Sequence, residues 1–157
     1  MSLINNEEEI VDLDLSVAKK KRIRINGDNS KILELNISDI GIVSRLSKLY
    51  PKLQKLAEKS MTFSKEELED NTEEGLKKFT DKLDSIDEEM CKLIDELFNA
   101  NVSEVCKDGG SMYDLFEGMF RFEYIITKLS QLYETNLESE FNKMRKRIDK
   151  HTGKYIK

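Results

Sequence analysis

The feature that most restricts the fold is a series of apolar residues spaced three and four positions apart between Leu76 and Leu97. The series is Leu76, Phe79, Leu83, Ile86, Met90, Leu93 and Leu97, with lysines and acidic residues between its members. An apolar residue about every 3.5 positions is the heptad pattern of a helix that buries one narrow edge against another helix. The pattern therefore predicts a helical protein built by packing helix edges together.

A second series of this kind follows Gly109 and Gly110. We expect Ser111 to cap this helix, and the two glycines to end a short helical turn over 101–106. Its apolar positions are Met112, Leu115, Met119, Phe122, Ile126, Leu129, Tyr133, Leu137, Phe141, Met144 and Ile148. The two series together predict a long antiparallel helical hairpin, in which 76–97 packs against 112–148. Alternatively, the two helices pack against a helix of another molecule.

The segment 21–37 carries the strongest strand signal in the chain. Polar and apolar residues alternate over 22–26 and again over 33–37, which is the period of a strand with one buried face. The intervening segment 26–30 contains asparagines, a glycine and an aspartate, which accept positive φ. We expect a β-hairpin with a loop of four or five residues, resting on a helix or on another copy of the protein.

A helix is expected over 39–60, with Ser38 as its N-cap. Pro51 lies inside it and predicts a kink or a break, because proline removes a backbone donor and clashes with the preceding turn. The residues that share the apolar face of this helix are Ile40, Val43, Leu46, Leu49, Tyr50, Leu53 and Leu56.

The helix that carries the first heptad series is expected to begin well before Leu76. Ser64 and Glu67 match a capping box, in which each side chain bonds a backbone N–H at the start of a helix. Residues 65–75 are almost wholly polar, so the first part of a helix over 65–99 would be exposed.

The fold class expected is mainly α, that is α+β with a small β part. Residues 1–18 form an acidic N-terminal arm that is either a short strand or disordered. Residues 19–150 form a single helical domain that includes the β-hairpin at 21–37. Residues 151–157 form a frayed basic tail.

Composition narrows the class of protein. Of 157 residues, 38% are hydrophobic and 36% charged, a balance that favours elongated helices with large solvated faces. The net charge of −5 argues against a dedicated DNA-binding protein. No apolar run approaches the ~20 residues of a membrane span, and no signal peptide is recognised. With two cysteines and no secretory signal, a cytoplasmic protein with reduced thiols is expected.

No catalytic, cofactor or metal site is expected. His151 is the single histidine, and no carboxylate or thiol cluster accompanies it in the sequence. Cys91 and Cys106 lack the spacing of a zinc knuckle and a basic partner that would activate a thiol. The segment 108–111 lacks the lysine and the spacing of a phosphate-binding loop. We therefore expect a protein that is not an enzyme.

The order of the segments along the chain resembles that of a known protein family. A basic hairpin over 22–37 leads into a helix that begins at Asp39, and Ile94-Asp95-Glu96-Leu97-Phe98-Asn99 precedes a short turn over 102–106. Then come Met112-Tyr113-Asp114-Leu115-Phe116-Glu117-Gly118-Met119 and a long helix ending in Arg145-Lys146-Arg147. Over about 20–150 this order resembles the tail assembly chaperones encoded between the tail tube and the tape measure genes in siphophages and prophages of Gram-positive bacteria.

The resemblance implies a mainly helical protein without enzymatic activity, acting in the bacterial host cell. It would bind the tape measure protein, keep it soluble, recruit tail tube subunits during assembly, and self-associate. A heptad helix can trade its apolar edge for that of a partner helix. The candidate partner-binding residues are Phe79, Leu83, Ile86, Met90, Leu93, Leu97, Met112, Met119, Phe122, Ile126, Arg22 and Arg24.

Three alternatives stay open. The seam residues could simply fill a core within the chain. The protein could be a structural coiled-coil or adaptor protein that remains in a finished assembly. It could also be a small regulator that binds nucleic acid through the basic run at 19–24 and the basic residues of 143–150, although nucleic acid is the less expected partner.

Overall fold

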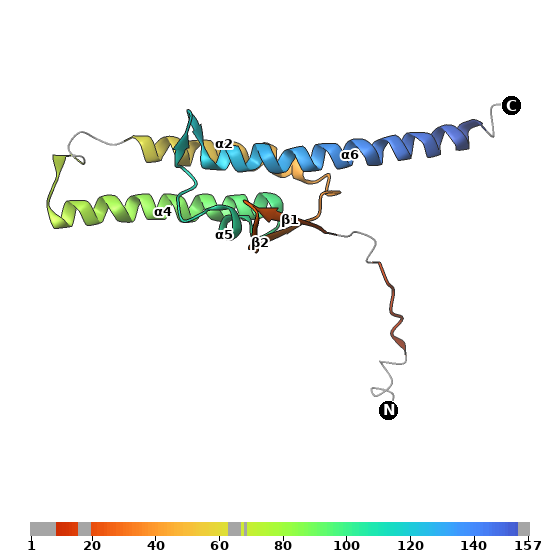
Figure 1. The fold of residues 1–157 in the computed structure, drawn as a ribbon, viewed down its shortest axis with the longest axis horizontal. Helices are drawn as coiled ribbons and strands as arrows, with labels where there is room; N and C mark the ends of the chain where they lie inside the picture. Colours follow the sequence, from red (N-terminus) through yellow and green to blue (C-terminus); the bar gives the residue numbers. More distant parts are fainter. Residues whose placement is uncertain (1–8, 16–19, 63–66, 68, 154–157) are drawn as a thin grey trace.

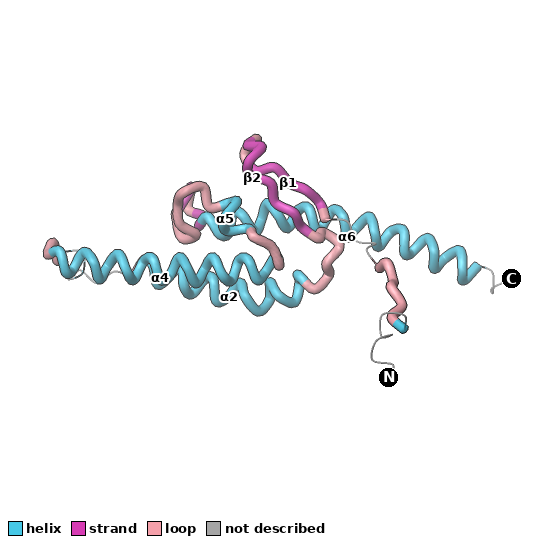
Figure 2. The backbone as a smooth tube through the Cα atoms, turned by 90° about the horizontal axis from the view of Figure 1, so that it is seen from below, coloured by secondary structure: helices cyan, strands magenta, loops and turns pink. Residues whose placement is uncertain are grey.

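The computed structural model describes residues 9–15, 20–62, 67 and 69–153. Its elements are a β-hairpin followed by helices, which confirms the expected mainly α class with a small β part. Three long helices dominate: α2 (Ile42–Met61), α4 (Glu73–Phe98) and α6 (Arg121–Gly153). They lie side by side with their axes roughly aligned, and α6 extends well past the other two (Figures 1 and 2).

One hydrophobic core joins the three helices and the hairpin. The Tyr50 ring of α2 lies 5.8 Å from the Phe122 ring of α6, and the Phe98 ring of α4 lies 6.0 Å from the Tyr133 ring. Its buried members are Leu33, Leu35, Ile42, Leu49, Leu53, Ala57, Ile86, Met90, Ile94, Leu97, Phe98, Val102, Met112, Phe122, Ile125, Ile126, Leu129 and Tyr133. The heptad series of α4 therefore packs inside the chain along its C-terminal half.

The helix pairing differs from the one predicted. Helices α2 and α4 pack against each other in antiparallel directions, whereas α4 and α6 run in the same direction (Figure 1). The predicted antiparallel hairpin of 76–97 with 112–148 is therefore wrong. Its physical cause is the segment 99–120, which carries the chain back along the bundle before α6 begins.

The segment 111–120 is not helical, although its apolar spacing fits a helix. Leu115–Phe116 (β3) and Met119–Phe120 (β4) pair as a short antiparallel hairpin around Glu117 and Gly118. Both central residues have positive φ, 52° and 81°, as a two-residue type I′ turn requires. The helix predicted to begin after Ser111 rested on the spacing of Met112, Leu115 and Met119, and this turn was not predicted.

The first turn of α6 is capped by the returning loop. The Arg121 N–H donates to the Asp114 carbonyl at 2.7 Å, and the Phe122 N–H donates to the Met112 carbonyl at 3.0 Å. These bonds satisfy two of the backbone donors that every helix leaves open at its start. The Arg121 side chain adds an Nε bond to the Ser111 carbonyl at 3.1 Å. α6 therefore begins at Arg121 rather than after Ser111.

A buried carboxylate fastens the same loop to α4. Asp87 is 7% exposed, accepts the Met112 N–H at 2.7 Å and forms an ion pair with Lys107. Asp95, two turns further along α4, accepts the Ser103 N–H and hydroxyl at 2.7 and 2.8 Å at the start of α5 (Val102–Cys106). These two acidic residues hold the loop in place, and neither was predicted to have a structural role.

The predicted N-terminal hairpin is present as β1 (Lys21–Ile25) and β2 (Asp28–Leu35). Its turn has two residues, Asn26 and Gly27, with φ of 55° and 71°, instead of the expected loop of four or five. The register shifts between Arg24 and Ile25, so the remaining turn-type residues form an irregular stretch of β2. Asp28 supports this stretch by accepting the Ser30 N–H at 2.9 Å.

Helix α2 starts three residues later than predicted, after Gly41 as its N-cap. It continues through Pro51 as one helix. Pro51 and Ser47 are both on the exposed side, so water can satisfy the Ser47 carbonyl that proline leaves without a donor. With this start, Ile40 and Val43 are 56% and 63% exposed instead of sharing the buried face.

Helix α4 begins at Glu73, with the Thr72 side chain accepting the Gly75 N–H at 3.0 Å. The predicted capping box begins at Ser64, which lies outside the described residues. A continuous helix over 65–99 is excluded by the non-helical residues 70–72. Leu76 is 55% exposed, so the packed part of the series starts further along α4.

Residues 9–15 of the N-terminal arm form no strand. Ile10, Val11, Leu13 and Leu15 are each more than two-thirds exposed. None of the helices in the described part of the chain is long and apolar enough to cross a membrane.

Candidate protein-binding surface

Near the middle of its own length, helix α6 extends out of the bundle that it forms with α2 and α4. Its last contacts with other elements include Tyr133, which packs on Phe98, and Asn136, whose Nδ2 donates to the Ile37 carbonyl at 3.2 Å and to the Ser38 Oγ at 3.1 Å. Beyond this point the helix projects past the other elements (Figure 1). The side chains of 138–148 are all exposed.

An apolar stripe continues along this projecting part. It consists of Leu137, Phe141, Met144 and Ile148, spaced four, three and four residues apart, and we call it the α6 stripe. Leu137 is half-buried, whereas Phe141, Met144 and Ile148 are 38%, 44% and 49% exposed. Such spacing places all four on one helix face, and the last three of them stay exposed on that face.

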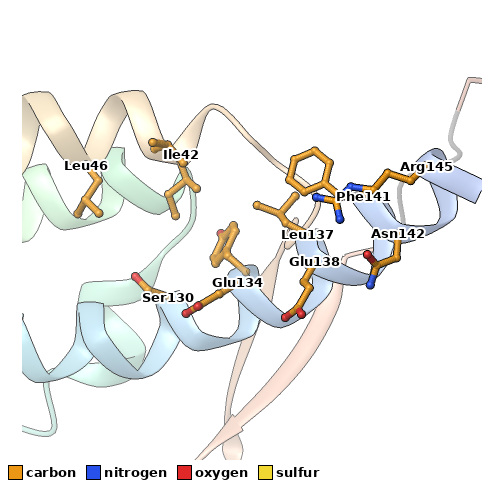
Figure 3. Close-up of a pocket in the computed structure, with 11 residues that line it drawn as sticks. Ile42, Leu46, Ser130, Glu134, Leu137, Glu138, Phe141, Asn142 and Arg145 are labelled. Atoms are coloured by element: carbon orange, nitrogen blue, oxygen red, sulfur yellow. The ribbon is translucent and has the colours of Figure 1, made fainter. Parts of the chain in front are cut away.

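The stripe opens into a groove between α6 and the start of α2. The groove has a volume of about 690 Å³. Figure 3 shows Ile42 and Leu46 pointing from α2 toward α6, with Leu137 and Phe141 on the α6 side. The lining residues are Ile42, Val43, Leu46, Ser130, Tyr133, Glu134, Leu137, Glu138, Phe141, Asn142 and Arg145. It is an apolar floor with a charged rim, as is common at helix-binding surfaces.

The charges along the stripe are segregated. Glu134, Glu138 and Glu140 precede its midpoint, whereas Lys143, Arg145, Lys146 and Arg147 follow it. Lys143 lies 3.6 Å from Glu140 in an ion pair between two well-exposed side chains. Exposed pairs of this kind contribute at most about 1 kcal/mol, so these charges stay available to a partner.

Polar contacts hold the α2 wall of the groove in place. The Arg45 Nε donates to the Leu97 carbonyl at the end of α4 at 2.8 Å, and its Nη2 lies 2.5 Å from the Asp39 carboxylate. The Leu97 carbonyl is one of the acceptors that a helix end leaves open, so Arg45 ties α2 to α4. On the α6 wall, burial raises the pKa of Tyr133 to about 12.

Half of the twelve sequence-predicted partner residues lie in the core. Ile86, Met90, Leu97, Met112, Phe122 and Ile126 are buried. Phe79, Leu83, Leu93 and Met119 are half-buried. Because the buried residues contact other elements of the same chain, they are not available to a partner while the protein stays folded in this way.

The two arginines of the predicted set are exposed on the hairpin. Arg22 lies 3.8 Å from Glu34 across the sheet, an ion pair between exposed side chains. Arg24 lines a second groove of about 690 Å³, beside Phe116 and Tyr124. The structure does not bring either arginine to the α6 stripe.

The cysteines are poorly suited to nucleophilic chemistry. Burial raises the pKa of Cys106 to about 11, and burial next to Asp87 raises the pKa of Cys91. A thiol needs a lowered pKa to react as a thiolate near neutral pH. Among the described residues, no group of three or more histidine, cysteine or acidic side chains could hold a metal ion.

No family model, curated protein or solved structure matches this chain. The residues of the α6 stripe were predicted as part of a longer helix and not as a binding surface. The signal that could have found it is the dense charge around 137–148, which contrasts with the apolar surroundings of 122–133.

Proposed function

We propose that this protein is a non-enzymatic, tail-assembly-chaperone-like protein that binds an amphipathic helix of another protein. The observation that carries the proposal is the exposed α6 stripe, which continues into an apolar groove beside Ile42 and Leu46. An exposed apolar patch with a polar rim on a folded protein is a common mark of a protein-binding site.

A helix is the partner that suits this surface. The stripe runs parallel to the α6 axis with heptad spacing, so a second helix can lay its own apolar edge along it. From Leu137 to Gly153 the projecting part is about 25 Å long at 1.5 Å per residue, which accommodates several helical turns. Met144 adds a flexible side chain that can adapt to different partners.

The tape measure protein of a siphophage is the partner that the resemblance implies, because it is long and helical. Covering its apolar edges would keep it soluble until tail tube subunits are recruited. The segment order over 22–150 supports this proposal, and so does the exposed position of the stripe. In this proposal the protein acts in the cytoplasm of the host cell and self-associates.

Co-expression with a long helical tape measure segment tests the proposal. We expect the wild-type chain to raise the soluble fraction of the segment and to be captured with it. Phe141→Glu places a charge in the middle of the stripe, and we expect at least a tenfold loss of capture. Ser139→Glu introduces the same charge on the opposite face of α6 and should keep the wild-type behaviour. Equal capture by both variants would exclude the stripe as the binding surface.

An adaptor protein could use the same surface. A chaperone leaves its partner when assembly is complete, whereas an adaptor stays in the finished particle in a fixed ratio. Mass spectrometry of purified tails separates the two. Finding this chain in a stoichiometric amount would favour the adaptor.

A further inference from the structure

The α6 stripe is symmetric about its own midpoint. Its spacing of four, three and four residues is the same in both chain directions, and the midpoint falls between Asn142 and Lys143. We propose that two copies of this protein pair through their α6 stripes in an antiparallel arrangement. Leu137 of each copy then meets Ile148 of the other, and Phe141 meets Met144. A two-fold interface requires this self-complementarity, in which one patch serves both copies.

The charges beside the stripe are complementary in the same arrangement. With Leu137 and Met144 at heptad position d and Phe141 and Ile148 at position a, Glu138 and Arg145 occupy e positions. In an antiparallel pair of helices, e positions face e positions, so Glu138 of one copy faces Arg145 of the other. By the symmetry of the pair this contact occurs twice.

The g positions on the other side of the stripe behave in the same way. They hold Glu140 and Arg147, and g positions face each other across an antiparallel pair. Glu140 of one copy therefore faces Arg147 of the other, again twice. The antiparallel arrangement has four oppositely charged pairs around four apolar layers.

A parallel pair is less favourable. In a parallel coiled coil a g position faces the e position of the next heptad, which pairs only Glu140 with Arg145, twice. It also sets the basic stretch 143–147 of one copy beside the same stretch of the other, and like charges side by side repel. The segregation of acidic and basic residues along α6 therefore selects the antiparallel orientation.

The shape of the molecule permits this pairing. The projecting end of α6 lies clear of α2, α4 and the hairpin (Figures 1 and 2). The pairing places the last turn of the second copy's α6 opposite Tyr133, at the mouth of the groove beside Ile42 and Leu46. The second copy thereby covers both the stripe and the end of the groove.

For its biological role the inference rests on the proposed function, because both occupants need the same stripe. The antiparallel dimer is the state that covers the stripe when no helical partner is bound. The partner helix and the second copy then compete, so added partner should convert dimer into a complex with one copy of this chain.

Sedimentation velocity of the full chain tests the pairing, because a dimer fraction must rise with protein concentration. We expect Phe141→Glu to be monomeric over the range in which the wild type dimerises, with an unchanged helical circular dichroism spectrum. Ser139→Glu, which carries the same added charge on the opposite face, should dimerise as the wild type does. A wild-type chain that stays monomeric up to the highest concentration would overturn the proposal.

Charge reversal and cross-linking test the orientation. Glu138→Arg with Glu140→Arg should abolish the dimer, and adding Arg145→Glu with Arg147→Glu should restore it. In a chain with Cys91→Ala and Cys106→Ala, Leu137→Cys and Ile148→Cys variants should form a disulfide only when mixed. In the antiparallel pair, two copies of position 137 lie about 16 Å apart along the axis. Self-linking of either variant would indicate a parallel pair and contradict the proposal.

The outcomes for the two proposals are separable. A monomeric chain that still captures a tape measure segment would overturn the antiparallel dimer and leave the proposed function intact. A dimer that captures no helical segment would overturn the proposed function and leave the pairing intact.

Discussion

The two halves of α6 have the same apolar rhythm and different surroundings. In the first half, Phe122, Ile126, Leu129 and Tyr133 are at most 5% exposed and contact α2 and α4. In the second half, Phe141, Met144 and Ile148 are 38–49% exposed. Periodicity identifies the face of a helix that seeks a partner, but the elements that surround the helix decide whether that partner is in the same chain.

The flanking residues separate the halves better than the apolar ones do. Few charges flank 122–133, whereas six of the eleven residues in 137–147 are charged. An apolar stripe flanked by many charged residues is suited to a surface that binds a partner and is exposed to water when no partner is bound.

Phe122→Ala should lower the free energy of unfolding by about 3–5 kcal/mol, because it leaves a cavity in the core. Phe141→Ala should change it by less than about 0.5 kcal/mol, as expected for a surface position. Urea unfolding followed by circular dichroism measures both, at a concentration where the chain is monomeric. Equal losses for the two variants would mean that the halves of α6 do not differ in the way described.

Asp87→Ala should destabilise the fold by about 2–3 kcal/mol, because the Met112 N–H and the Lys107 ammonium lose their partner. Met112 precedes the buried half of α6, so the position of that half should depend on the hydrogen bond between Met112 and Asp87. Glu88→Ala, at an exposed neighbouring position, is the control and should be nearly neutral. Capture of a helical segment by the folded Asp87→Ala protein should stay unchanged, since Asp87 is neither in the α6 stripe nor among the residues that line the groove.

Gly118→Ala should lower stability by about 1 kcal/mol, because its φ of 81° strains any residue with a Cβ. Glu117→Asn at the neighbouring turn position should be neutral or slightly stabilising, since asparagine tolerates φ near 52°. Thermal unfolding measures both changes. A neutral Gly118→Ala would argue against the turn that precedes α6.

The smallest expected effect on stability comes from Tyr133, which lies at the border between the two halves of α6. This effect appears only at high pH and is absent at neutral pH. Burial raises its pKa to about 12 from an ordinary value of 10.0. The folded chain therefore holds this proton more tightly than the unfolded chain does. Its contribution to stability is complete below pH 10 and is lost as the pH rises from 10 toward 12. Melting temperatures over this range should fall less steeply for Tyr133→Phe, and identical slopes would contradict the assignment.

Sequence patterns predicted the positions of the helices and strands better than they predicted which elements pack against each other. The heptad series located the C-terminal part of α4, and the alternation over 21–37 located the hairpin, because each signal depends on local spacing. The start of α6 was missed because Met112, Met119 and Phe122 fit a helix equally well. The pairing of β3 with β4 and the positive φ at Glu117 and Gly118 exclude it.

The α6 stripe was not selected as a candidate binding surface for a similar reason. The residues first chosen as partner contacts have the strongest apolar rhythm, and that rhythm is what a core requires. Whether Ile86 or Phe141 stays exposed depends on where the segment 99–120 sends the chain, and this is set by contacts such as Asp87 with Met112. Such contacts join residues that are distant in sequence and show no period.

The contact between Tyr50 and Phe122 joins the first long helix to the last one. A ribosome delivers the chain from its N-terminus, so α2 and α4 emerge while the helix that completes their shared core is still being made. For that interval the apolar faces around Leu53 and Met90 have no cover from α6. During translation the chain is thus exposed to aggregation for as long as its final third takes to be synthesised.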